Sequence, residues 1–281
     1  MTEIYFAGTT GGNYKKLLKF GARNLLFSYY MLRKKKDDKV VDIFEDVKSV
    51  EGTKIFVDSG THSFTTEYGV GVYKKRAKNV GKFVNEKNFN SKILKYMKDY
   101  IVWLKKFKKY LDVYVSLDVD EIIGPKQVDK YNQIFFDCGL KPLVVWHPER
   151  SIEDFEKMCQ ENSYVGIGGA KVEYIKFEYK IYRKLFDIAE KYKTKIHGFA
   201  LTRTYLLELL PFFSADSTSW QSGFKYGQLH RFNGHTMKTF NAKSRDYNTL
   251  FKYQVMSWFR YSQYLSEYWK NAYWEVKENG V

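Results

Sequence analysis

Three short apolar runs of the chain each end on an aspartate. They are Lys54–Asp58, Val113–Asp118 and Phe212–Asp216. An apolar run of this length that stops at a polar residue is typical of a strand buried on both faces of a parallel sheet. Carboxylates can act as nucleophiles or move protons, and two that share a site can divide these roles. The pattern therefore predicts a group of reactive carboxylates at the ends of buried strands.

Eight such runs alternate with amphipathic helices, which predicts a single (β/α)8 barrel of TIM type. In a barrel the C-terminal ends of the strands share one mouth, so the three aspartates are expected to converge there. An open doubly wound sheet is the alternative, and the lack of a dinucleotide-binding glycine fingerprint disfavours it. The expected strands cover Ile4–Ala7, Asn24–Ser28, Lys54–Val57, Asp112–Leu117, Pro142–Trp146, Tyr164–Ile167, Lys195–Phe199 and Phe212–Ala215.

The 281 residues are expected to form one domain. The barrel would cover residues 1 to about 220, and a basic loop and a C-terminal helix would cover 221–281. The segment from Thr61 to about Asn90 is predicted to be a long loop, and loops of that length are usually lids or binding loops.

The aspartates also have structural explanations, because Asp often caps a helix N-terminus. Three aspartates on separate strand ends weaken that explanation. A divalent metal held by His62, His147 or His197 together with carboxylates is another alternative. The chain has no His-x-His or His-Glu-x-x-His pattern, which favours a site without metal or cofactor. His197 lies inside a predicted strand, where a packed, hydrogen-bonded histidine is the commoner case.

The net charge is +15, from 47 Lys and Arg against 32 Asp and Glu. An excess of this size predicts a polyanionic partner such as nucleic acid, although a lysine-rich proteome would also produce it. Trp220 is a candidate stacking surface for a base, with a place in the core as the alternative. The expected phosphate contacts are Lys74, Lys75, Arg76, Lys78, Lys225 and Arg231.

Only two cysteines occur, Cys138 and Cys159, which argues against a disulfide framework. No apolar run approaches the ~20 residues needed to cross a bilayer, and the N-terminus has no secretory signal. These observations predict an intracellular protein without a membrane partner.

The order of these motifs resembles the tRNA-guanine transglycosylases. The resemblance covers roughly residues 50–220 and lies in the ordered placement of the motifs on successive strand ends. The motifs are Asp58-Ser59-Gly60, Asp118, Gly168-Gly169 and Phe-Ser-Ala-Asp216-Ser. The form Ser-Ala-Asp-Ser-Thr-Ser-Trp is most similar to the phage and bacterial branch that inserts 7-deazaguanine bases into DNA.

The resemblance implies that guanine is exchanged for a 7-deazaguanine base through a covalent glycosyl intermediate. Asp216 would be the nucleophile, and Asp58 would be the general acid and base. Asp118, or Asp120 as a rival, would recognise the guanine-like edge of the base. The other implied substrate-binding residues are Ser59, Gly60, Gly168 and Gly169.

One departure from the family concerns zinc. The tRNA enzymes carry a Cys3His zinc site after the last strand, whereas this chain has no cysteine after Cys159. The resemblance therefore implies DNA as the polymer, with tRNA as the alternative, and no metal. It also implies a cytoplasmic enzyme, acting in the host cytoplasm if phage-encoded. A barrel that binds nucleic acid without catalysis is the remaining alternative.

Overall fold

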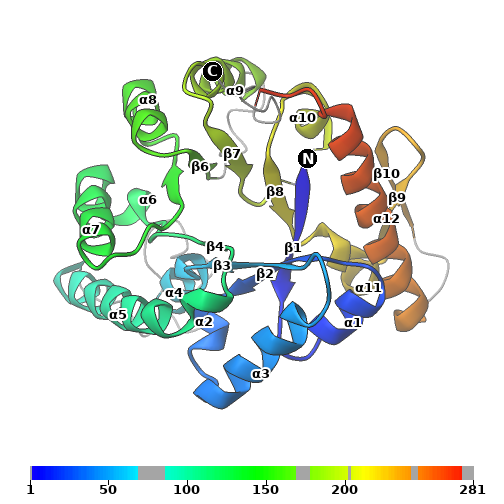
Figure 1. The fold of residues 1–281 in the computed structure, drawn as a ribbon, viewed down its shortest axis with the longest axis horizontal. Helices are drawn as coiled ribbons and strands as arrows, with labels where there is room; N and C mark the ends of the chain where they lie inside the picture. Colours follow the sequence, from blue (N-terminus) through cyan, green and yellow to red (C-terminus); the bar gives the residue numbers. More distant parts are fainter. Residues whose placement is uncertain (1, 69–85, 169–177, 202–203, 242–245, 274–281) are drawn as a thin grey trace. The chain divides into compact units, whose positions relative to one another are not determined.

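The chain folds around one parallel sheet. In a computed structural model, which describes residues 2–68, 86–168, 178–201, 204–241 and 246–273, eight strands form a curled sheet with helices between them (Figure 1). This is an α/β fold of TIM type with a C-terminal helix, so the predicted fold class is confirmed.

The strands follow the order β4-β3-β2-β1-β8-β7-β6-β5 in the sheet. A parallel bridge joins Val115, just after β4, to Leu143, just before β5. Leu143 N donates to Tyr114 O at 2.8 Å, so the segment just before β5 is hydrogen-bonded to β4. The strands are β1 Glu3–Thr9, β2 Asn24–Ser28, β3 Lys54–Asp58, β4 Val113–Tyr114, β5 Val144–Trp146, β6 Tyr164–Ile167, β7 Lys195–Gly198 and β8 Ser214–Ser217.

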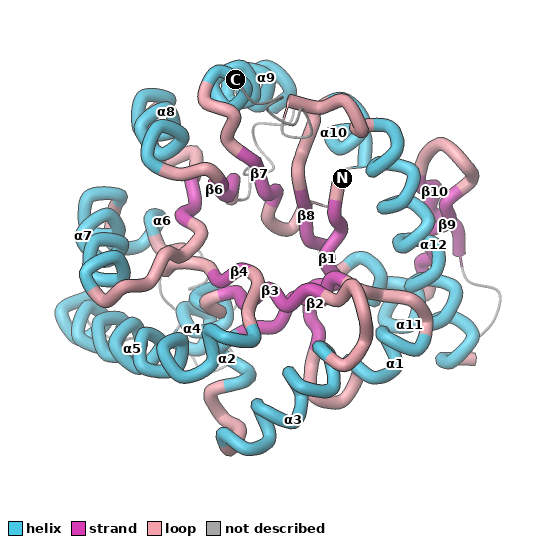
Figure 2. Tube along the Cα trace, viewed as in Figure 1, coloured by secondary structure: helices cyan, strands magenta, loops and turns pink. Residues whose placement is uncertain are grey.

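Helices connect successive strands (Figure 2). None of the helices in the described part of the chain is both long and apolar enough to span a bilayer. The helices are α1 Tyr14–Lys19, α2 Tyr29–Leu32, α3 Asp37–Lys48, α4 Thr61–Tyr68, α5 Glu86–Phe107, α6 Asp120–Ile123, α7 Pro125–Asp137, α8 Ile152–Glu161, α9 Glu178–Lys191, α10 Thr204–Leu209, α11 Ser222–Tyr226 and α12 Tyr247–Tyr268.

The chain divides into two compact units. The first unit comprises Met1–Leu26 and Trp146–Val281, and the second comprises Phe27–Val145. The predicted single domain over residues 1–281 stays a prediction.

An aromatic cluster forms the core of the second unit. Phe44 of α3 is fully buried, and its ring lies 5.8 Å from Phe27, 6.1 Å from Trp103 and 6.2 Å from Phe107. On α5 the buried residues recur every three or four positions, which is the stripe that a helix presents to a core. This packing fixes α3 and α5 against β2.

The core of the first unit depends on α12. Its N-cap Asp246 accepts hydrogen bonds from Asn248 N and Thr249 N, which satisfies two backbone donors of the first turn. Ser262 Oγ accepts from Ile4 N at 3.2 Å, so the helix is hydrogen-bonded directly to β1. The buried face of the helix consists of Leu250, Phe251, Gln254, Val255, Ser257, Trp258, Tyr261 and Leu265.

Several elements differ from the predicted ones. Helix α3 is absent from the prediction, although its buried residues Val40, Ile43, Phe44 and Val47 have helical spacing. The predicted loop from Thr61 begins with α4, because Phe64 packs at 4.3 Å from the ring of Tyr96 and holds the segment against α5.

The end of the barrel also differs. The eighth strand begins two residues later than predicted, so Asp216 lies inside β8 and pairs with Tyr5 of β1. Polar residues can occupy this strand because Ser214 and Asp216 have buried hydrogen-bond partners. The predicted basic loop contains α11 and an antiparallel hairpin, β9 Gln228–Phe232 and β10 Met237–Asn241.

The Phe44 cluster gives a stability prediction. Phe44→Ala should lower the free energy of unfolding by about 3–5 kcal/mol, since it removes a fully buried ring and leaves a cavity. Phe136→Ala is the control, because that ring is 38% exposed on α7, and it should change stability by less than about 1 kcal/mol. Urea unfolding of both variants tests this, and equal stabilities would contradict it.

Candidate active site

Asp216 is a buried carboxylate on β8. It is 6% exposed; its Oδ1 accepts a hydrogen bond from Ala200 N at 2.9 Å and lies 3.3 Å from His197 Nε2. Ala200 follows β7 with φ of +49°, a left-handed conformation that is unusual for a residue other than glycine. Within the described residues both hydrogen bonds of Asp216 end on Oδ1, so Oδ2 takes part in neither.

His197 extends this contact into a chain across three strands. His197 Nδ1 lies 2.6 Å from Ser214 Oγ, and Ser214 Oγ lies 2.5 Å from Tyr164 OH. His197 and Ser214 are both fully buried. The strands β6, β7 and β8 pair in a register that places Gly166 beside His197 and His197 beside Ser214.

The chain has one consistent arrangement of protons when Asp216 is ionised. A neutral imidazole has one donor and one acceptor nitrogen. Donation from Nε2 to Asp216 leaves Nδ1 as the acceptor for the Ser214 hydroxyl, which in turn accepts from the Tyr164 phenol. Burial raises the pKa of Tyr164 well above its ordinary value, and the nearby carboxylates of Glu3 and Asp216 raise it further against the opposing Ser214 hydrogen bond. The phenol therefore keeps its proton at neutral pH and can stay the donor at the head of the chain.

The turn after β3 holds Asp58 in the second unit. Asp58 is the last residue of β3, and Gly60 follows with φ of +72°. A Cβ on Gly60 would lie 2.4 Å from Tyr30 Cβ and 2.5 Å from Ser28 Oγ, so only glycine fits. Ser59 is fully buried, and its carbonyl accepts from Tyr96 OH at 2.5 Å.

This turn is tied to the segment after β4. Thr61 Oγ1 lies 3.2 Å from Ser59 Oγ and donates to Asp118 O at 3.0 Å. The contact fixes the backbone that carries Asp58 relative to the backbone that carries Asp118. Asp58, the last residue of β3, and Asp118, which follows β4 after three residues, thus lie on segments that are connected through one threonine.

The charge of Asp58 acts on two buried phenols, Tyr96 and Tyr100. Burial raises the pKa of Tyr100 well above its ordinary value, and the Asp58 charge adds to this. The pKa of Tyr96 is raised by burial first, and then by Tyr29 and Asp58, with Arg33 opposing. Burial and then the Asp99 charge raise the pKa of Tyr29 to about 12. These rings therefore contribute O–H donors and no negative charge.

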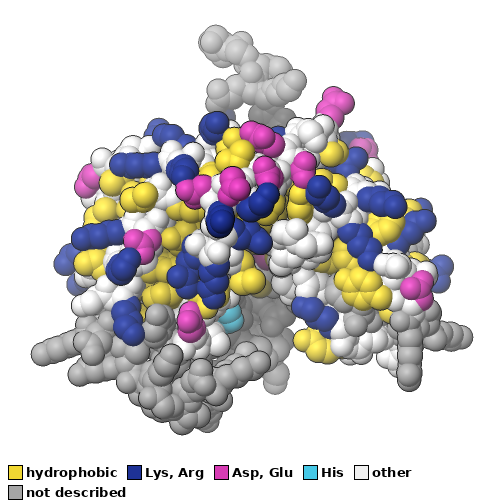
Figure 3. All heavy atoms as spheres, turned by 90° about the horizontal axis from the view of Figure 1, so that it is seen from below, with side chains coloured by type: hydrophobic (Ala, Val, Ile, Leu, Met, Phe, Trp, Pro, Cys, Tyr) yellow, Lys and Arg dark blue, Asp and Glu magenta, His cyan; other side chains and the backbone are white. Residues whose placement is uncertain are grey.

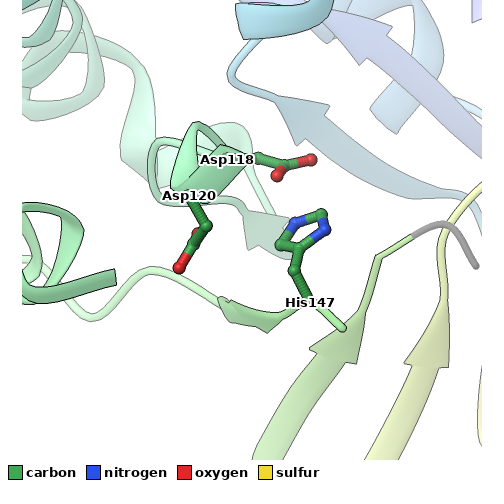
Figure 4. Close-up of side chains that lie close together, drawn as sticks. All are labelled: Asp118, Asp120 and His147. Carbon is green, nitrogen blue, oxygen red and sulfur yellow. The ribbon is translucent and has the colours of Figure 1, made fainter. Parts of the chain in front are cut away.

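Asp118 lies between β4 and α6, and Asp120 is the first residue of α6 (Figure 4). Asp120 is 4% exposed and opens α6, and Gly124 N donates to its carbonyl at 2.9 Å. A carboxylate oxygen of Asp118 lies within 4.8 Å of one of Asp120. Such a pair can accept N–H groups of a base, and carboxylates are also ligands of hard divalent cations. Figure 4 also labels His147, which belongs to the first unit.

Gly168 lies against an imidazole of its own unit. It directly follows β6, and its N–H donates to Trp146 O at 2.8 Å. A Cβ on Gly168 would lie only 2.0 Å from His147 Cε1, so the flat ring next to the glycine in this structure is that of His147. Gly169 lies outside the described residues, and the predicted base pocket beside these glycines stays a prediction.

The other predicted site residues have different settings. Trp220 is 1% exposed, donates from Nε1 to Ala7 O at 2.9 Å and packs on Phe6 and Phe251. Its ring therefore lies in the core and presents no open face to a base. Lys225 and Arg231 are exposed on α11 and β9. The predicted phosphate contacts Lys74, Lys75, Arg76 and Lys78 lie outside the described residues.

Basic side chains are spread over the one face of the described residues that Figure 3 shows. On the face shown in Figure 3, lysines and arginines alternate with hydrophobic and acidic groups and do not gather into one stripe. The net charge of +15 alone therefore does not locate a nucleic-acid interface.

The surroundings of His197 and His62 are relevant to the alternative in which the site holds a metal ion. Both ring nitrogens of His197 lie within hydrogen-bond distance of protein side chains, as expected for a packed histidine inside a strand. His62 is exposed on α4. His197 is thus already engaged as a partner of Asp216, which disfavours a role in binding a metal.

Tyr164, Ser214 and Ala200 are site residues that the sequence prediction lacks. Ser214 and Asp216 have the two-residue spacing of one strand face, and this signal could have paired them. Tyr164 and Ala200 come from other elements, and only the register of β6, β7 and β8 brings them to the site.

Comparison with known proteins supports the architecture. No family model matches the chain, and no curated protein matches it. The tryptophan synthase complex from Pyrococcus furiosus is 12% identical with a TM-score of 0.51, over 92% of this chain and 98% of that chain. A chain from Aquifex aeolicus VF5, described as a structural study of Project ID, is 9% identical with a TM-score of 0.46, over 94% of this chain and 93% of that one. The likeness to tryptophan synthase shows the fold alone.

The contact between Gly168 and His147 gives a prediction. Gly168→Ala should lower the free energy of unfolding by about 1–3 kcal/mol, because the new methyl group forces the imidazole to move. Gly12→Ala is the control, since the nearest atom to its added Cβ is Thr10 Oγ1 at 3.8 Å, and it should stay within about 0.5 kcal/mol of the parent. Urea unfolding measures both, and an unchanged Gly168→Ala protein would show that the ring is not held against this backbone.

Proposed function

We propose that the chain is a base-exchanging transglycosylase that replaces guanine in DNA with a 7-deazaguanine base. One observation carries the proposal. Asp216 is a buried carboxylate near the C-terminal end of a parallel strand, and its hydrogen bonds hold Oδ1 only. Barrel enzymes hold their reactive groups at this end of the strands. The resemblance of the ordered motifs to the tRNA-guanine transglycosylases supplies the reaction.

The first half of the reaction forms a covalent intermediate. Oδ2 of Asp216 attacks C1′ of the target nucleotide, and the bond from C1′ to N9 of guanine breaks. The electron pair of that bond goes to the departing base, which takes a proton from the Asp58 carboxyl group. Asp58 has this role by resemblance, and it is the residue that ends β3.

The second half reverses these steps with a different base. The 7-deazaguanine gives the proton of its ring nitrogen to Asp58, and that nitrogen attacks C1′. The bond from C1′ to Oδ2 breaks and restores the Asp216 carboxylate. Two displacements at one carbon retain its configuration, and the exchange needs neither an oxidant nor a reductant.

The environment of Asp216 fits a nucleophile that must also leave. Donors on Oδ1 keep the carboxylate in one orientation and stabilise its negative charge when the ester bond breaks. Burial restricts water, which would otherwise hydrolyse the glycosyl ester. A buried charge is costly to fold, and a barrel that only binds nucleic acid has no evident need for one at this position.

Mass spectrometry of nucleosides tests whether the protein exchanges bases. The chain is expressed in a host that makes 7-deazaguanine precursors, and DNA and tRNA are digested separately for mass spectrometry of their nucleosides. Modified deoxynucleosides are expected with the parent protein and should be absent with Asp216→Asn. Asp187→Asn is the control, because that carboxylate is exposed on α9, and it should retain full activity.

Each other outcome is informative. Modified bases found only in tRNA would show that the substrate is tRNA and not DNA, and the proposed mechanism would be unchanged. Intact exchange in Asp216→Ala would exclude this residue as the nucleophile. Nucleic-acid binding without any base exchange would favour the non-catalytic barrel.

His197 is expected to act as a positioning residue that orients the Asp216 carboxylate. His197→Leu removes one donor to Oδ1, so kcat for base exchange should fall by about 10²-fold while KM changes little. His197→Gln keeps an N–H group near Oδ1 and should recover part of the loss. Tyr164→Phe breaks only the far end of the chain and should have a smaller effect. A folded His197→Leu protein with unchanged kcat would exclude this role.

A further inference from the structure

The β9–β10 hairpin has one face against the protein and one face toward solvent. Its inner face packs on α12, where Phe232 lies 5.7 Å from Tyr261 and His230 lies 5.8 Å from Trp258 (Figure 1). Gln254 Nε2 of α12 also donates to His230 O at 3.2 Å. The hairpin is therefore held at a fixed position on α12.

The outer face consists of two cross-strand pairs. Arg231 stands opposite Lys238, and Leu229 stands opposite Phe240. Like charges directly opposite each other destabilise an antiparallel pair. Both Arg231 and Lys238 are exposed, and neither forms an ion pair with a carboxylate of the described residues. This arrangement is unfavourable for the isolated protein and favourable beside an anion.

The sequence around the hairpin has no acidic residue to balance these charges. Between Asp216 and Asp246 there is no Asp or Glu, whereas the whole chain has 32 of them. Glu208 of α10 approaches the hairpin turn, but its Oε1 accepts from Thr236 Oγ1 at 2.7 Å and from Tyr261 OH at 3.1 Å. The basic residues of this stretch are Lys225, Arg231, Lys238, Lys243 and Arg245.

Exposed aromatic rings accompany the charges. Phe240 on the outer face is 48% exposed, and Tyr226, which ends α11 just before β9, is 77% exposed. Aromatic side chains beside basic ones form the stacking platforms on which single-stranded nucleic acid binds. An acidic protein would also match the charge, but it would not need open ring faces.

We propose that the outer face of the β9–β10 hairpin binds a single strand of nucleic acid. Arg231 and Lys238 contact phosphates, and Phe240 and Tyr226 stack on bases. The inference deepens the proposed function and rests on it for the polymer, because a base that reaches a buried carboxylate must be unpaired from its partner strand. Binding itself does not require Asp216.

Fluorescence anisotropy of a labelled single-stranded oligonucleotide tests the charged pair. Arg231→Ala combined with Lys238→Ala should raise Kd about tenfold or more. It should also reduce the slope of log K against log salt by about 1.4, which corresponds to two phosphate contacts on a single strand. Lys98→Ala combined with Lys105→Ala removes the same charge from the exposed face of α5 and should leave both quantities nearly unchanged.

The aromatic residues have a different signature. Phe240→Ala should raise Kd about 5- to 100-fold without a change in the salt slope, because stacking releases no counterions. Phe136→Ala, at a ring of similar exposure on α7, should have no effect on Kd. Far-UV circular dichroism confirms that each variant is folded.

Three results would overturn the inference. Equal weakening by the two charge variants would mean that the overall charge of +15 binds the strand non-specifically. Tighter binding of a duplex, with no effect of Phe240→Ala, would exclude stacking. Normal binding by all hairpin variants would show that the hairpin does not bind the strand, and it would leave the proposed base exchange unaffected. Conversely, a hairpin effect on binding without base exchange in the parent protein would refute the proposed function and support the hairpin.

Discussion

Burying the Asp216 carboxylate has a free-energy cost, and this cost constrains the strands around it in the first unit. A carboxylate that is 6% exposed must be hydrogen-bonded, since a buried charge without partners would destabilise the fold. Its two partners come from β7 and from the turn that follows β7. The left-handed backbone at Ala200 is tolerated because it directs an N–H group at the charge. The register of β7 against β8 is thus fixed by polar contacts as well as by apolar packing.

The need for hydrogen-bond partners also applies to the buried residues that follow Asp216 in this chain of contacts. When neutral His197 donates to the carboxylate, its other ring nitrogen is an acceptor, and Ser214 Oγ lies within hydrogen-bond distance of it. Ser214 in turn needs the Tyr164 hydroxyl, whose pKa is raised by burial first. Each of these side chains is hydrogen-bonded to the next, so the row can be buried without leaving a polar atom that lacks a hydrogen-bond partner. An apolar interior would be simpler to fold, so the polar row is best explained by the carboxylate at its end.

The sequence predicts those parts of the fold that depend on local pattern. Apolar runs mark the strands, and β2 and β6 have the predicted bounds. Helix α3 and the hairpin also have local signals, helical spacing from Val40 to Val47 and the turn pair Asn233-Gly234, yet both are missing from the prediction. The His197 chain could not be predicted, because it depends on which strands are neighbours and in what register. Trp220 shows a related limit, since its burial depends on α12, which is distant in sequence.

The buried and the exposed residues of the first unit suit different tasks: the buried group around Asp216 suits catalysis, and the exposed hairpin suits binding of a nucleic-acid strand. Asp216, His197 and Ser214 are nearly inaccessible, so they can act on a base or sugar brought to them but cannot hold a polymer. The hairpin follows β8 after a 3-10 helix, Ser219–Gln221, and the short helix α11. It has the opposite character, with exposed cations and rings on its outer face. Burial lowers the pKa of His230 on its inner face, so this imidazole is neutral near pH 7 and packs on Trp258 as a ring. The positive charge of the hairpin therefore lies on the outer face, where it can attract a strand without disturbing the core beneath.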